Sequence, residues 1–168
     1  MTTVRTSLMG REVLTHLDDQ IASARRLLGT ILAQGEDIRA QRVDGVIERL
    51  AEIKTEMGMR ERLEQERTDL LTRAGMELGL PAAAVTLDVL ADLMSPVEAE
   101  AARGRSAELR GLLDEIVREH GINRALMRQE LAFLDHLVRL IGDEPDDGYR
   151  PDSGPRARTK HRVLDLQA

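Results

Sequence analysis

The residues of this chain best suited to chemistry are four histidines, His16, His120, His136 and His161. Glu12 stands four residues before His16, so on a helix the two side chains would share a face and offer two ligands to a metal ion. No third ligand stands near this pair, and the Glu-x-x-His motifs of di-iron helical bundles do not occur in the sequence. We therefore predict no metal site, and we interpret His120 as a polar residue in a seam between helices.

Motifs that hold phosphate groups or cofactors are also missing from the sequence. It has no glycine-rich dinucleotide loop, no Gly-Lys pair and no cysteine for thiolate chemistry. Lys54, Glu64 and Arg67 have no neighbouring nucleophile, so we interpret them as charges that are solvated or paired between helices. The sequence predicts no catalytic residue and no cofactor, and an enzyme is the least supported class of protein.

The apolar residues define the fold class. Phe133 and Tyr149 are the two aromatic residues, so Leu, Ile, Val, Ala and Met must supply the core. These residues recur every three to four positions, which is typical of long amphipathic helices. We predict an all-α fold in which an antiparallel hairpin of two long helices is followed by a long C-terminal helix, forming an elongated three-helix or coiled-coil bundle. Such a bundle makes seams between helices rather than a deep pocket, and seams favour the binding of other helices.

Local signals predict the ends of the two hairpin helices. Ser7 is a candidate N-cap for a first helix over residues 8–41. Asp44-Gly45 is typical of a turn and a new helix start. The second helix is expected to end at a cluster of breaking residues, Gly75, Gly79 and Pro81.

Two capping signals predict the remaining helices. Thr86 is expected to cap a short helix from Leu87 to Met94. Ser95-Pro96-Val97-Glu98 forms a capping box with proline at the first helical position, and no further proline occurs until Pro145. The sequence thus predicts a helical domain over residues 1–142 and a flexible tail over residues 143–168, rich in proline, glycine and charge.

The charge balance restricts the class of partner. The formal net charge of −6 disfavours a nucleic-acid partner, which usually selects basic proteins. No apolar run is long enough to cross a bilayer, and the first residues carry no apolar signal core. Together with the lack of cysteine, these features predict a cytoplasmic protein without membrane insertion.

A set of residues occurs in a characteristic order along residues 9–168: Leu27-Leu28, the Asp44 turn, Lys54, Glu66-Arg67, Leu70-Leu71, Gly75, Leu87 to Leu90, Asn123 and the ending Arg162-Val163-Leu164-Asp165. In this order the chain resembles the FlgN-type flagellar export chaperones. Two positions depart from the family pattern. Gln34-Gly35 stands where an acidic residue is usual near the end of the first helix, and Arg124 follows Asn123 where a small or amide residue is usual.

The resemblance implies a cytoplasmic chaperone of type III export. Such a protein binds the C-terminal helical region of flagellar hook-associated proteins, prevents their premature assembly and delivers them to the export gate, as a monomer or homodimer. We expect the cargo helix to lie on the surplus apolar face of the last helix, the tail tyrosine to contact the export gate, and the terminal apolar residues to fold over the cargo. The predicted partner-binding residues are Asn123, Leu126, Phe133, Leu137, Leu140, Tyr149, Val163, Leu164 and Leu166.

Other interpretations remain open from the residues alone. The chain could be a structural coiled-coil dimer, or a helical regulator that sequesters a protein partner. Asn123, as a polar residue in an apolar seam, could fix the register of that seam instead of touching cargo. Tyr149 could pack against the end of the last helix.

Overall fold

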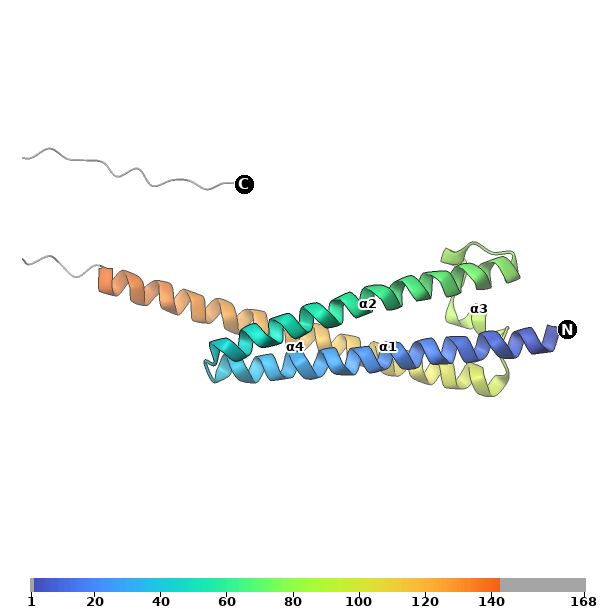
Figure 1. The fold of residues 1–168 in the computed structure, drawn as a ribbon, viewed down its shortest axis with the longest axis horizontal. Coiled ribbons are helices and arrows are strands. Elements are labelled where there is room, and N and C mark those ends of the chain that lie inside the picture. Colours follow the sequence, from blue (N-terminus) through green and yellow to red (C-terminus); the bar gives the residue numbers. More distant parts are fainter. Residues whose placement is uncertain (1, 143–168) are drawn as a thin grey trace, which may run out of the picture.

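The fold is a long, slender assembly of helices, seen in a computed structural model that describes residues 2–142 and the side chains of residues 8–139 (Figure 1). Its elements are α1 (Thr2–Arg39), α2 (Val43–Leu78), the 3-10 helix η1 (Ala82–Ala84), α3 (Leu87–Ala91) and α4 (Pro96–Gly142). All regular elements of this described part are helical, which confirms the prediction of an all-α fold.

Helix α1 is the central element, because it packs along both α2 and α4, whereas α2 and α4 form no packed pair of comparable extent. The α1–α2 hairpin is antiparallel. Arg26, in the second half of α1, donates to Glu56 of α2 at 2.9 Å, while Glu12, near the start of α1, pairs with Arg73 near the end of α2. Helix α4 runs parallel to α1, as Figure 1 shows.

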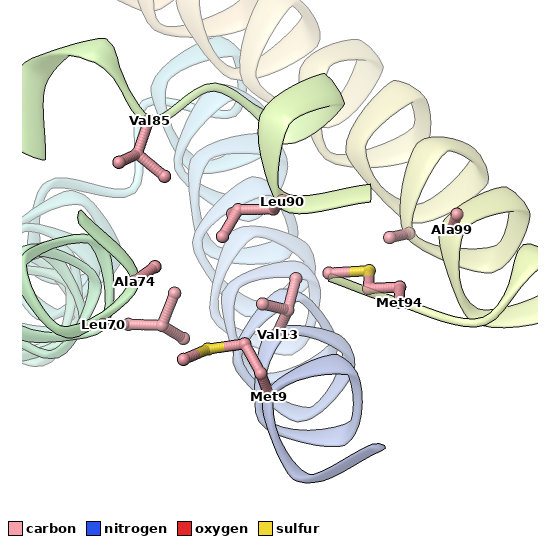
Figure 2. Packing of buried hydrophobic residues seen from close by; sticks show 9 residues of the cluster. Met9, Val13, Leu70, Ala74, Val85, Leu90, Met94 and Ala99 are labelled. Carbon is pink, nitrogen blue, oxygen red and sulfur yellow. The ribbon is translucent and has the colours of Figure 1, made fainter. Parts of the chain in front are cut away.

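Two buried apolar clusters hold α1 to its neighbours. The first lies where α1, α2, α3 and α4 meet (Figure 2), and its members are Met9, Val13, Leu70, Ala74, Val85, Leu90, Met94, Ala99 and Ala102. The second joins α1 to α4 through Ala24, Leu27, Leu28, Ile31 and Ile116. Before Leu70, α2 contributes no buried residue. The first half of α2 is therefore held largely by half-buried side chains and ion pairs.

The predicted capping signals at the later helices are confirmed. The Ser95 hydroxyl accepts from the Glu98 backbone N–H at 3.3 Å, and the Glu98 carboxylate accepts from the Ser95 backbone N–H at 3.0 Å. Hydrogen bonds from the Ser95 hydroxyl and backbone N–H lower the pKa of Glu98 below its ordinary value. Thr86 accepts from the Val89 backbone N–H at 3.3 Å. Gly79 ends α2 with φ 67°, a left-handed conformation that glycine adopts without strain.

The N-cap predicted at Ser7 is wrong, because Ser7 lies inside α1. No proline or glycine precedes Ser7, so nothing in the sequence stops the helix from extending back to Thr2. Smaller differences concern helix ends: α1 ends at Arg39 rather than 41, α2 begins at Val43 with Asp44 in its first turn, and α3 ends at Ala91 rather than Met94. One or two residues of variation at helix ends is usual.

Helix α4 extends well past the end of the hairpin (Figure 1). Asn123 of α4 lies against Gln34 of α1, and α1 ends five residues later at Arg39, whereas α4 continues for 19 residues to Gly142. At 1.5 Å per residue, α4 outruns α1 by roughly 20 Å. The last turns of α4 thus have no helix of the described chain beside them.

Candidate partner-binding surface

The projecting end of α4 carries a concentration of exposed apolar side chains. The exposed fractions are 62% for Leu131, 54% for Phe133, 54% for Leu134 and 68% for Val138. Isolated large apolar residues are common on protein surfaces, but a contiguous group of them usually marks an interaction site. We define these last turns, from Leu131 to Gly142, as the α4 tip.

Eight of the nine predicted binding residues fall in three groups. Phe133 is exposed on the α4 tip, and Leu126 and Leu137 are half-buried along the same stretch of helix. Leu140 lies within α4, but its side chain is outside the described part of the structure. The predicted residues of the tail also lie outside the described residues; these are Tyr149, Val163, Leu164 and Leu166.

The predicted binding stripe covers only part of the apolar surface of the α4 tip. Helical spacing places Phe133 and Leu137 on the predicted stripe, while Leu131 and Val138 form a second stripe roughly 120° further around the helix. The seven-residue step between Leu131 and Val138 is the signal that would have revealed it. Together the stripes cover about half of the helix circumference, which is wider than the narrow seam of a two-stranded coiled coil.

Asn123 is not part of this exposed surface. It is 1% exposed and lies in the seam between α1 and α4. Its side-chain Nδ2 donates to the Ile31 carbonyl at 2.7 Å and to Gln34 Oε1 at 3.2 Å. Its polar groups therefore act inside the chain, where a buried amide pair restricts the register of two helices.

The family departure at Gln34-Gly35 has a structural explanation. Gln34 is fully buried and supplies the side-chain acceptor for Asn123. A Cβ atom on Gly35 would lie 2.7 Å from Asn123 Oδ1, closer than real contacts allow. Glycine at this position thus lets the Asn123 amide approach the α1 backbone. Gln34 Nε2 has no hydrogen-bond partner among the described residues.

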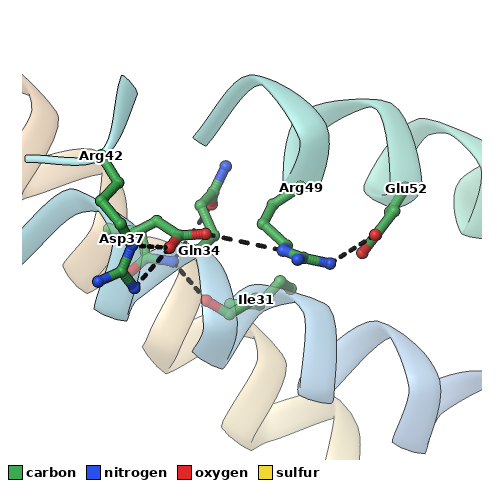
Figure 3. A network of polar contacts seen from close by, with 7 residues as sticks. Ile31, Gln34, Asp37, Arg42, Arg49 and Glu52 are labelled. Atoms are coloured by element: carbon green, nitrogen blue, oxygen red, sulfur yellow. Dashed lines mark hydrogen bonds and ion pairs between the residues drawn. The ribbon is translucent and has the colours of Figure 1, made fainter. Parts of the chain in front are cut away.

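A polar network at the end of α1 sets the turn into α2 (Figure 3). Asp37 is 8% exposed and accepts from Arg42 Nε at 2.8 Å, and Arg49 Nε lies 3.7 Å from the same carboxylate. The hydrogen bond to Glu52 raises the pKa of Arg49 above its ordinary value. These contacts position the hairpin.

The predicted seam position of His120 is wrong, because His120 is exposed. The seam residues of α4 that face α1 follow one another at steps of three and four, from Ile116 to Glu119 and then to Asn123. Glu119 therefore lies nearer to α1 than His120 does, and its side chain is 16% exposed. No group of three or more potential metal ligands occurs among residues 2–142. The helices of this region also include none that is long and apolar enough to cross a membrane.

Comparison with known proteins assigns the family. The model of the FlgN protein family matches residues 9–157. No curated protein and no solved structure matches the chain. Since the family match covers most of the 168 residues, the chain belongs to the FlgN family of flagellar export chaperones.

Proposed function

We propose that this protein binds the C-terminal helical region of flagellar hook-associated proteins, prevents their premature assembly and delivers them to the export gate. The proposal combines family membership with one observation, the unaccompanied and apolar α4 tip. A cargo helix laid on the stripe formed by Leu126, Phe133, Leu137 and Leu140 would be bound as an amphipathic helix in an apolar groove.

The energetics of the α4 tip favour a partner. Helices in proteins are stabilised mainly by burying an apolar face. The tip has such a face, but no other described helix covers it. A cargo helix would both bury these side chains and stabilise the helix that carries them.

The tail supplies two further parts of the proposal. Val163, Leu164 and Leu166 would fold over the bound cargo. The conformational entropy that this segment loses would keep the affinity moderate, so that the cargo could be released without nucleotide hydrolysis. Tyr149 would contact the export gate. The roles of Tyr149 and of the terminal apolar residues follow from residue type and family membership, because these residues lie outside the part of the chain that the structure describes.

The proposal is tested by isothermal titration calorimetry, in which purified hook-associated proteins are titrated into the unmodified protein and into the Phe133→Asp variant. We expect the dissociation constant to rise about 30- to 150-fold, which corresponds to about 2–3 kcal/mol for lost apolar burial and an introduced charge. The matched control is Ala132→Asp, because Ala132 is exposed on the opposite, polar face of the same helix turn. Equal affinity of Phe133→Asp and the unmodified protein would reject the α4 tip as the cargo site.

The competing interpretation is a structural coiled-coil dimer that uses the same apolar residues. Light scattering coupled to size exclusion at two concentrations separates the two cases. A monomer, or a dimer that still binds cargo with one cargo molecule per chain, agrees with the chaperone. A dimer that Phe133→Asp dissociates, and that binds no hook-associated protein, would show that the tip serves dimerisation instead.

A further inference from the structure

A second candidate docking surface lies on the body of the molecule, between α2 and α4. Because these two helices pack on α1 but not extensively on each other, a groove of about 520 Å³ remains between them. We call it the α2–α4 groove. Its apolar lining comes from all four helices, through Leu17 of α1, Leu71 of α2, Leu87 and Leu90 of α3, and Leu109 and Leu113 of α4.

The groove has the length of a short helix. Arg60 and Leu71 line it along α2, and 11 residues of helix span about 16 Å, or three turns. At one end it is closed by the segment that contains α3, where Figure 2 shows Val85 and Leu90 bridging over α1 between α2 and α4. At the other end Ile53 of α2 packs against the cluster that contains Ile116 of α4.

Two arginines and one glutamate line the α2 side of the groove, at positions 60, 67 and 64. Arg60 lines the α2 side, and its Nη1 is buried without a hydrogen-bond partner among the described residues. Arg110 of α4 is exposed and does not itself line the groove, but helical spacing places it beside the lining residues Ser106 and Leu113, and it forms no ion pair with the described residues. Arg67 pairs with Glu64 at 3.3 Å, so these two opposite charges offset each other and Arg60 is the lining arginine that is left without a partner among the described residues.

We propose that the α2–α4 groove receives two to three turns of an amphipathic cargo helix that carries acidic residues on both sides of its apolar stripe. The apolar stripe would complete a four-helix arrangement over Leu17, Leu109 and Leu113. A carboxylate would accept the orphan N–H of Arg60, because a buried guanidinium N–H without an acceptor is costly and a charge-assisted pair is strong. The identity of the cargo rests on the proposed function; the chemistry of its helix rests on the groove.

Charge argues against the chain's own tail as the occupant. The tail sequence contains Arg156, Arg158, Lys160 and Arg162. These cations would face Arg60 and Arg110 across the rims. An acidic helix from a partner complements the same rims, even though the whole chain carries a formal charge of −6.

Photo-crosslinking tests which segment enters the groove. The chain has no cysteine, so Ser106→Cys accepts one benzophenone label inside the groove. Gly104→Cys is the matched control, since position 104 lies on the opposite side of α4 with open space around it. With full-length hook-associated protein as the probe, we expect label 106, and not label 104, to crosslink a cargo segment with acidic residues flanking an apolar stripe. A crosslink to residues 156–168 of the same chain would overturn the proposal in favour of the tail.

The rim arginines are tested by binding and stability together. We expect Arg60→Met combined with Arg110→Gln to raise the dissociation constant of the same cargo about 10- to 100-fold. The melting temperature of the free protein should be unchanged or higher, because Arg60 has no acceptor to lose. Arg128→Gln on the polar face of α4 is the control for a general loss of positive charge.

The outcomes separate this proposal from the proposed function. If cargo binds, and Phe133→Asp weakens it while the arginine variants do not, the groove proposal is overturned and the α4 tip remains the cargo site. If no hook-associated protein binds the unmodified chain, both are overturned. A lower melting temperature of Arg60→Met would assign Arg60 a structural role and also contradict the groove proposal.

Discussion

Replacing Asn123 by alanine should destabilise the protein although it removes only a small side chain. The Asn123 amide donates to the Ile31 carbonyl and to Gln34 Oε1, both inside the α1–α4 seam. Each net hydrogen bond contributes about 0.5–1.5 kcal/mol, and a buried acceptor left without a donor adds about 1–3 kcal/mol. Gln34 is fully buried, so water cannot replace the lost donor. Together these contributions predict a loss of about 2–6 kcal/mol in the free energy of unfolding.

A double-mutant cycle isolates the amide pair. Asn123→Leu combined with Gln34→Leu replaces both partners by apolar groups, so the double variant should be close to the unmodified protein in stability or exceed it. Each single variant should be less stable, and the coupling energy should reach about 0.5–3 kcal/mol. Urea unfolding followed by far-ultraviolet circular dichroism measures all four proteins.

Two results would contradict this reasoning. A loss below about 0.5 kcal/mol for Asn123→Ala would mean that the amide pair is not buried as described, because surface substitutions have effects of that size. Additive effects of Asn123→Leu and Gln34→Leu would mean that the two side chains do not interact, and the assignment of a register-setting pair would be wrong.

Three further predictions concern packing, pH and the tail. Gly35→Ala should destabilise the protein by about 1–3 kcal/mol, because its Cβ would meet the Asn123 amide, whereas Gly121→Ala, with open space, should stabilise α4 by up to about 1 kcal/mol in the same thermal melts. Stability from the lowered pKa of Glu98 is present above the ordinary pKa of a glutamate and is lost as the pH falls through the lower folded value; Ser95→Ala should raise that pKa in an NMR titration, and an unchanged pKa would contradict the capping assignment. Truncation after Asp143 should leave the helix content of residues 2–142 unchanged but weaken cargo binding. Unchanged affinity of the truncated protein for its cargo would exclude a role for the tail.

The helices and most of their ends were predictable because their signals are local. The Ser95–Glu98 capping box, the Thr86 cap and the glycine at the end of α2 each act within a few residues, and all three lie where they were expected. The antiparallel hairpin followed from two apolar stripes of similar length joined by a short turn. Ser7 failed as an N-cap because a capping residue has this role only where the preceding backbone leaves the helix.

The surface features were harder to predict because they depend on contacts distant in sequence. The Asn123–Gln34 bond joins residues 89 positions apart, and it sets how far α4 extends beyond α1. That offset decides whether Leu131 and Val138 are core or surface, and periodicity alone cannot distinguish the two. The α2–α4 groove likewise exists because α2 and α4 pack on a common partner and not on each other.

The central claim is that the α4 tip is free in the unbound chaperone and covered by cargo. Hydrogen–deuterium exchange of the full-length protein, with and without a saturating hook-associated protein, measures this directly. The account predicts fast amide exchange over residues 131–142 in the free protein and strong protection of the same amides in the complex. Cargo binding at saturation with no added protection over these residues would contradict it.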